Sequence, residues 1–109
     1  MELSMITTAF NLEGFRVIKN LGMVRGVTVR CLPFKGMFKA GFQMMACGKL
    51  ELYTELCEKA RAEAFDLMIK HAQELGAGAI IGVRYDATQL YEQATEVLCY
   101  GTAVQVEKV

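Results

Sequence analysis

The 109-residue chain has few of the side chains that hydrolytic enzymes use as nucleophile and base. Ser4 is its only serine, His71 is its only histidine, and no nucleophile lies in a glycine-flanked elbow. Hydrolase triads need a nucleophile and a histidine held in one site, so none is expected here. A thiolate of Cys47 or Cys99 activated by His71 has no supporting spacing in the sequence.

The chain also lacks an excess of charge of either sign. Its 12 basic and 12 acidic residues give a formal net charge of +0 at pH 7, and no block of like charges forms a tail. Proteins that bind the phosphate backbone of nucleic acids carry clustered basic charge. We therefore expect no nucleic-acid partner.

Long apolar runs are missing as well, and we expect no signal peptide at Met1–Thr8. No run reaches the roughly 20 residues that span a bilayer, and Met1–Thr8 has neither the basic nor the apolar part of a signal peptide. We expect a cytoplasmic protein without a membrane partner. Cys31, Cys47, Cys57 and Cys99 form no Cys-x-x-Cys pair, so free, buried thiols are expected in that reducing compartment.

Apolar residues are abundant, at 53% of the chain, which suits a single domain over residues 1–109 with its own core. Two stretches rich in β-branched residues, Phe15–Leu21 and Val24–Cys31, predict strands of an N-terminal hairpin. Gly22 stands where a tight connection or a bulge lets them pair. Pro33 ends the second strand.

Helical spacing begins after Pro33. Apolar residues at steps of four and three predict a short helix over Phe34–Cys47 and a long one over Glu51–Leu75, closed by Gly76 in a left-handed conformation. The stripe predicted to pack on the sheet consists of Tyr53, Cys57, Ala60, Ala64, Met68, His71 and Leu75.

The C-terminal third predicts strands over Ala77–Tyr85 and Val97–Val106, joined by a polar loop over Asp86–Gln93. The last strand is apolar on both faces, which requires cover on both sides. One long helix covers only one face of the expected four-stranded sheet. The second face is therefore covered by other copies of the chain or by the short helix, and we expect a homo-oligomer.

Several motifs carry a family resemblance. They are Thr7-Thr8, Gly14, Leu-Gly-x-Val-x-Gly at Leu21–Gly26, Ala60–Ala64, Leu-Gly-Ala-x-Ala-Ile-Ile-Gly-Val-Arg-Tyr-Asp at Leu75–Asp86, and Gly-Thr-Ala-Val at Gly101–Val104. Together they resemble the YbjQ-like family, which is labelled heavy-metal-binding and has no established activity. The resemblance implies a two-layer α+β fold like the dodecin subunit, an antiparallel sheet packed on one long helix, assembled as a ring that we expect to be a pentamer.

The family supplies no ligand motif that transfers residue by residue. Its members commonly have Arg-Asp and then Gly-Gly-Arg-Ser before the long helix, where this chain has Gln43-Met44 and Cys47–Leu50. The residues themselves suggest Met44, Met45 and Cys47 as metal ligands, because their sulfur atoms suit copper(I) or other soft metals. The structural alternative is a methionine-rich patch packed at an interface.

His71 is interpreted as a hydrogen-bonded packing residue. Cys57 and His71 are fourteen residues apart on one helix, about 21 Å at a rise of about 1.5 Å per residue, so they can meet only between subunits.

Three hypotheses follow. The leading one is a ring-forming protein that binds a heavy metal or small ligand at subunit interfaces. The second is a structural or partner-binding module that uses Phe34–Cys47 as an amphipathic surface. The third is an enzyme whose ring pocket gathers Cys99, Tyr100 or Tyr85 with a carboxylate of a neighbouring chain.

Overall fold

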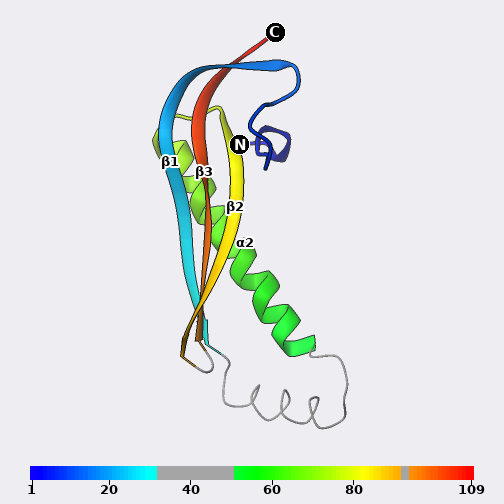
Figure 1. The fold of residues 1–109 in the computed structure, drawn as a ribbon, viewed down its shortest axis with the longest axis vertical. Helices are drawn as coiled ribbons and strands as arrows, with labels where there is room; N and C mark the ends of the chain where they lie inside the picture. The colour runs from blue at the N-terminus through cyan, green and yellow to red at the C-terminus, as the bar shows by residue number, and fades with distance from the viewer. Residues whose placement is uncertain (32–50, 92–93) are drawn as a thin grey trace.

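The computed structural model of the protein describes residues 1–31, 51–91 and 94–109. They form two layers, a three-stranded antiparallel sheet and one long helix packed against it (Figure 1). The predicted α+β class is confirmed, with three strands among the described residues instead of four. The segment Phe34–Cys47, predicted as a short helix, lies outside the described residues. In chain order the elements are the 3-10 helix η1 (Leu3–Met5), β1 (Phe15–Cys31), α2 (Glu51–Glu74), β2 (Ala79–Tyr91) and β3 (Ala94–Lys108), and the sheet order is β1-β3-β2.

Strand β1 is continuous, so the predicted N-terminal hairpin is wrong. β3 pairs with it from Phe15 opposite Lys108 to Cys31 opposite Ala94. Gly22 has a φ of 102° and lies beside a register shift, where it forms part of a bulge. A glycine with positive φ suits a bulge as well as a turn, and the length of the partner strand decides between them.

Strand β2 also runs farther than predicted. The expected polar loop over Asp86–Gln93 is wrong for the described part, because β2 continues to Tyr91. Asp86 pairs with Leu98, and Thr88 pairs with Glu96. These polar residues alternate along an edge strand with one side open to water, which made them resemble a loop in the sequence.

Helix α2 has nearly the predicted bounds and ends as expected. Gly76 has a φ of 75°. The N–H of Gly76 donates to the carbonyl of Gln73, and the N–H of Ala77 donates to the carbonyl of Ala72, each at 3.0 Å. This pair of bonds is the Schellman arrangement, which satisfies carbonyls at a helix end.

The packed stripe of α2 is narrower than predicted. Ala60, Ala64 and Met68 are buried as expected, but Cys57 and Leu75 are exposed and Ala72 is buried instead. Ala60, Ala64 and Ala72 lie at steps of four with Met68 in one row, and the three alanines allow the helix to approach the sheet along it. The described residues contain no helix that is both long and apolar enough to cross a membrane.

The tightest contact between the layers is at Gly26 of β1. A Cβ atom on Gly26 would overlap the carbonyl oxygen of Ala64 and lie 2.6 Å from the backbone nitrogen of Met68. The helix backbone therefore rests directly on the backbone of β1. The core around this contact consists of Val24, Met68, Ile80, Val83, Val97, Cys99 and Ala103, with the alanines of the α2 stripe.

The N-terminal segment lies along part of the β2 edge. Thr7 donates its N–H to the carbonyl of Ile80, and Gly82 donates to the carbonyl of Ala9. Arg84 secures this arrangement, because one of its terminal nitrogens donates to the carbonyl of Thr8 at 2.8 Å. Its guanidinium carbon also lies 5.6 Å from the ring centroid of Phe10. The upper part of β2 thus has a partner on its outer edge.

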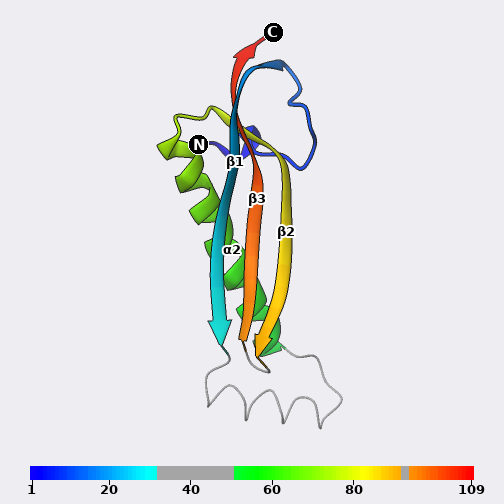
Figure 2. The same cartoon turned by 60° about the vertical axis from the view of Figure 1, so that its left-hand side comes forward.

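The sheet face opposite α2 carries exposed apolar side chains. Met23 is 68% exposed, Val29 is 50% exposed and Val27 is 41% exposed. They lie on the same face as Leu98 and Tyr100, which pair with neighbouring positions. In the described part of the chain α2 lies on the other face of the sheet (Figure 2). The sequence prediction that one helix covers a single face is therefore confirmed.

Candidate ligand-binding grooves on the two flanks of helix α2

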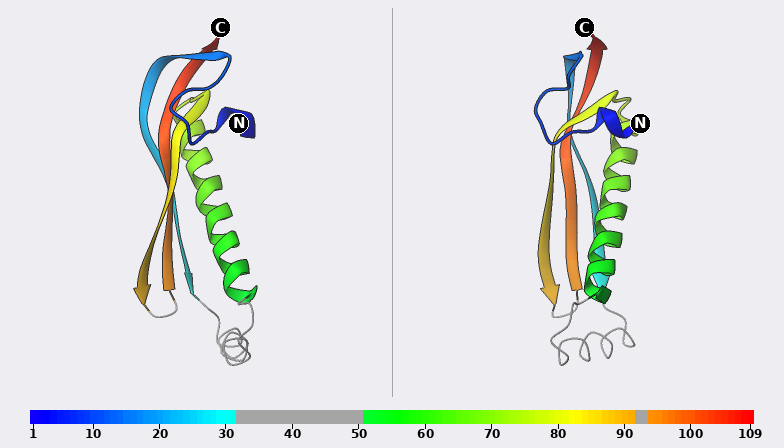
Figure 3. Two further views of the ribbon diagram at one scale, coloured as in Figure 1. Left: turned by 45° about the vertical axis from the view of Figure 1, so that its right-hand side comes forward. Right: turned by 90° about the vertical axis from the view of Figure 1, so that its right-hand side faces the viewer.

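Helix α2 does not lie centrally over the sheet. It packs on β1 and β3 and leaves much of the inner face of β2 open (Figure 3). One surface groove follows the flank of α2 at the edge of β1, and another lies on the opposite flank above β2. We call them the β1-edge groove and the β2 groove.

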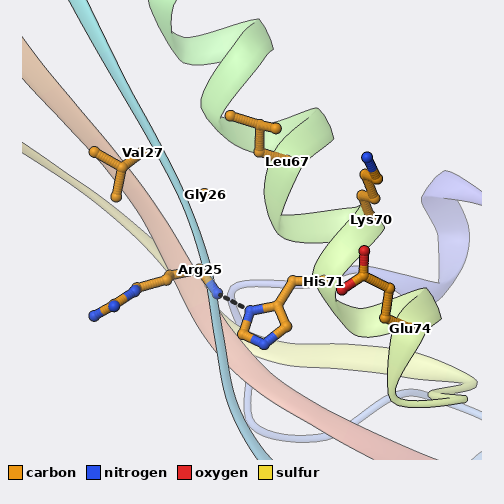
Figure 4. A pocket seen from close by; sticks show the side chains of 7 residues that line it. All are labelled: Arg25, Gly26, Val27, Leu67, Lys70, His71 and Glu74. Atoms are coloured by element: carbon orange, nitrogen blue, oxygen red, sulfur yellow. Dashed lines mark hydrogen bonds between the residues drawn. The ribbon is translucent and has the colours of Figure 1, made fainter.

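The β1-edge groove has a volume of about 360 Å³ and contains His71 (Figure 4). Nδ1 of His71 accepts a hydrogen bond from the backbone N–H of Arg25 at 3.2 Å. The predicted packing role is confirmed. A ring nitrogen that accepts a hydrogen bond carries no proton, so the proton of the neutral ring is on Nε2. Nε2 is then a donor and offers no lone pair to a metal ion.

Charged side chains flank His71 in this groove. Lys70 and Glu74 project from α2, whereas the side chain of Arg25 extends from β1 away from the helix (Figure 4). Leu67 supplies an apolar wall and is 45% exposed. The groove therefore combines an ammonium group, a carboxylate and an N–H donor beside an apolar surface.

The β2 groove has a volume of about 260 Å³ and is built around Tyr85 and Arg61. The guanidinium carbon of Arg61 lies 6.0 Å from the centroid of the Tyr85 ring. Glu58 and Phe65 complete the lining with Ala62. An arginine above an aromatic ring keeps its N–H donors available for an anion while the ring offers a flat apolar surface.

A buried sulfur pair lies below Tyr85. Cys99 pairs with Tyr85 across the strands, and its thiol donates to Sδ of Met68 at 3.6 Å. Burial raises the pKa of the Cys99 thiol, and a hydrogen bond with Tyr85 opposes this shift. Burial also raises the pKa of Tyr85, and the nearby Cys99 adds to it. Both groups are neutral at pH 7, so Cys99 is not a thiolate nucleophile.

The predicted site residues have different outcomes. Met44, Met45 and Cys47 lie outside the described residues, so the metal site stays a prediction. Within residues 1–31, 51–91 and 94–109, no group of three or more His, Cys, Asp or Glu side chains could hold a metal ion. Cys57 and Cys99 are free thiols as predicted, but only Cys99 is buried.

The residues of the enzyme hypothesis are only partly brought together. Tyr85 and Cys99 are cross-strand neighbours on the face covered by α2, and Glu58 lies in the groove above them. Tyr100 follows Cys99 in β3 and therefore points to the opposite face. Of the three side chains named in the hypothesis, Tyr85 lies in the groove, Cys99 is buried as a protonated thiol, and Tyr100 lies on the other face.

Sequence reasoning missed the two grooves. Sequence patterns assigned Arg61 no role beyond the Ala60–Ala64 motif, and Lys70 lies outside the stripe predicted to pack on the sheet. The spacing of Glu58, Arg61 and Phe65 at steps of three and four was the available signal for a shared flank. It did not indicate that β2 extends beyond the cover of the helix.

One solved structure supports the fold. It is a protein of unknown function of the DUF74 family from Pediococcus pentosaceus, with a TM-score of 0.56 and 19% identity. The match covers 94% of this chain and 96% of the other. At this identity the match shows the fold alone.

Relatives in sequence are much closer. A UPF0145 protein of Chromobacterium violaceum is 55% identical over 103 residues, which cover 94% of this chain and 88% of the relative. A UPF0145 protein of Solibacter usitatus is 50% identical over 101 residues, 93% of this chain and 90% of that protein. The family model that matches residues 4–107 is that of YbjQ, described as "Putative heavy-metal-binding". The chain therefore belongs to the YbjQ family.

Proposed function

We propose that this protein assembles through its two sheet edges into a closed ring of identical subunits and binds a soft metal ion or another small ligand at the subunit interfaces. We also propose five subunits, as the family resemblance implies, and a cytoplasmic location, where the free thiols of Cys57 and Cys99 remain reduced.

The assembly is inferred from the positions of two stretches on the outer edges of the sheet. They lie opposite the same residues of β3, the strand between them. β1 and β2 are the outer strands of the sheet. On β1, the N–H of Arg25 is bonded to His71, and the described residues place no strand on the outer side of Val27 to Cys31. On β2, the N-terminal segment is bonded at residues 80–83, and the described residues place no strand on the outer side of Asp86, Ala87 and Thr88.

These two stretches are level with each other through their common partner β3. Val27 and Asp86 both pair with Leu98, and Val29 and Thr88 both pair with Glu96. The arrowheads of β1 and β2 end at the same end of the sheet (Figure 2). A closed ring requires neighbours related by rotation without translation along the axis. With the strands running along the ring axis, such neighbours bring the two open stretches side by side.

Charge favours a head-to-tail ring over a two-fold dimer. β1 carries Arg16, Lys19, Arg25 and Arg30 and no acidic residue, whereas β2 has one basic and one acidic residue, Arg84 and Asp86. A dimer formed by two β1 edges would oppose like charges, which is destabilising. Pairing β1 with β2 of the next subunit avoids this repulsion. It also joins the apolar sheet faces opposite α2 of neighbouring subunits into one surface.

Native mass spectrometry of the untagged protein tests the assembly, with a pentamer expected. Val29→Pro is the informative variant. The N–H of Arg25 points out of the β1 edge, and Val29 lies four residues farther along the same strand, so its N–H points out of the edge as well. Proline is tolerated at such a position in an isolated edge strand but cannot pair with a neighbour. We expect monomers with unchanged circular dichroism. Val29→Thr keeps the N–H and should keep the ring; a monomeric native chain would refute the proposal.

The metal part rests on the sulfur ligands Met44, Met45 and Cys47 and on the family description. Protein purified without chelators should retain a soft metal detectable by elemental analysis. The triple variant Met44→Leu, Met45→Leu, Cys47→Ser should lose it while keeping its subunit number. Native protein with no measurable affinity for silver(I) or copper(I) would contradict this part.

A further inference from the structure

We infer that ring assembly joins the β2 groove of one subunit to the β1-edge groove of the next, and that the combined site binds a small aromatic monocarboxylate. The inference rests on the proposed ring and names the chemical class of the small ligand. It is distinct from the sulfur-based metal site.

The grooves lie on opposite flanks of α2, so a head-to-tail neighbour turns one toward the other. Glu58, Arg61 and Phe65 line the flank above β2, and Leu67, Lys70 and His71 line the flank at the β1 edge. In the ring, β1 of the next subunit lies beside β2. The β1-edge groove of that next subunit therefore opens over the part of β2 that faces the helix layer and is not covered by α2.

The two grooves also lie at the same position along the strands. His71 is fixed beside Arg25 by its hydrogen bond. Arg25 and Arg84 both pair with Tyr100, and Tyr85 is the next residue after Arg84. A neighbour related by rotation alone therefore carries its His71 at the level of Tyr85. Neither groove is enclosed in the single subunit, and the neighbour supplies the missing wall.

The groups that meet there are mainly hydrogen-bond donors. Among the described residues the ion pairs are Arg16 with Glu107 and Arg30 with Glu63, so Arg61 has no carboxylate partner. Its guanidinium can hold a carboxylate by two parallel hydrogen bonds. Nε2–H of His71 and the Lys70 ammonium of the neighbouring subunit add donors from the other side. These positive and donor groups disfavour a metal cation.

The walls select among anions. Tyr85 and Phe65 offer aromatic surface on one subunit, and Leu67 adds apolar surface on the other. This favours a flat ring over a bare inorganic anion. Glu58 and Glu74 also line the grooves and offset part of the positive charge, which fits one carboxylate better than a polyanion. The groove volumes of about 260 and 360 Å³ together fall within the roughly 300–1,000 Å³ of ligand sites.

Benzoate is the probe, with isothermal titration calorimetry on the full-length ring as the readout. Arg61→Gln and the double variant Lys70→Gln, His71→Phe should each weaken benzoate binding at least about tenfold, since each loses charged hydrogen bonds. Lys108→Gln removes a distant exposed cation and should bind as the native chain does. Benzamide, which is similar in shape but uncharged, should bind more weakly; equal affinity would overturn the inference.

Mixed rings test whether the site is shared. When the Arg61→Gln chain and the Lys70→Gln, His71→Phe chain are refolded together in equal amounts, about one quarter of the interfaces regain both intact grooves. Native-affinity benzoate sites should reappear in that fraction, which a site within one subunit could not do. Native mass spectrometry on the same samples separates the failures: rings without restored sites refute this inference alone, whereas monomers refute the assembly.

Discussion

The two flanks of α2 are built on different principles. At the β1 flank the helix backbone rests on Gly26, and Ala64 and Met68 are fully buried. At the β2 flank Arg61 reaches over an aromatic ring that is 47% exposed, and no comparable row of small residues closes the gap. The first flank sets the position of the helix. Because the helix packs closely on β1 at the first flank, it leaves the groove above β2 at the second flank uncovered.

The largest expected effect comes from Gly26→Ala. The added Cβ would overlap the carbonyl oxygen of Ala64, so the helix must move away from β1. We expect a loss of more than about 3 kcal/mol of unfolding free energy, measured by urea denaturation, because the clash involves backbone and not a flexible side chain. Gly78→Ala is the matched control, since its Cβ would come no closer than 3.7 Å to another atom. Equal stability of both variants would contradict the close packing of α2 on β1 at Gly26.

Met68→Ala tests the same flank by removing volume. The side chain is fully buried and contacts Cys99, so its loss leaves a cavity costing about 2–5 kcal/mol. Thermal and urea unfolding measure this. The neighbouring Leu67→Ala removes a side chain that is 45% exposed and should cost less than about 1 kcal/mol in an isolated subunit. If Met68→Ala lost less unfolding free energy than Leu67→Ala, the description of Met68 as buried and Leu67 as exposed would be wrong.

The smallest effect is expected at the floor of the open flank and depends on pH. Folding raises the pKa values of Cys99 and Tyr85, so the folded chain holds these protons more tightly than the unfolded chain. Their contribution is complete below the unfolded pKa of cysteine, about 8.5, and is lost as pH rises through the folded values. Unfolding free energy should therefore fall with rising alkaline pH, and Cys99→Ala should flatten the decline.

Local chemistry accounts for what the sequence predicted well. The alanine-rich helix and its end at Gly76 depend on spacing and on one glycine conformation, both visible in the chain. Gly22 was ambiguous because the same positive φ serves a turn or a bulge. The polar end of β2 was mistaken for a loop because an open edge strand carries polar side chains.

The grooves could not be predicted from the same patterns. They depend on the sideways position of α2 over the sheet, which follows from the absence of a side chain at Gly26. His71 was correctly predicted as a packing residue, but its partner, the N–H of Arg25, is 46 positions away in the chain. The location of Tyr85 relative to Arg61 requires the same three-dimensional information.

The bulges of β1 have a consequence for insertions and deletions. β1 has 17 residues and β3 has 15, although their ends are paired, so β1 contains two extra residues, one in Val17–Lys19 and one in Asn20–Gly22. Each extra residue reverses the alternation of side chains, and the second reversal cancels the first. A chain that lost one of them would turn its N-terminal strand segment inside out. A relative that lost both would keep the side chains of residues 15–17 on their present faces and would turn over only Lys19 and Asn20 between the bulges, so length variation here should come in steps of two.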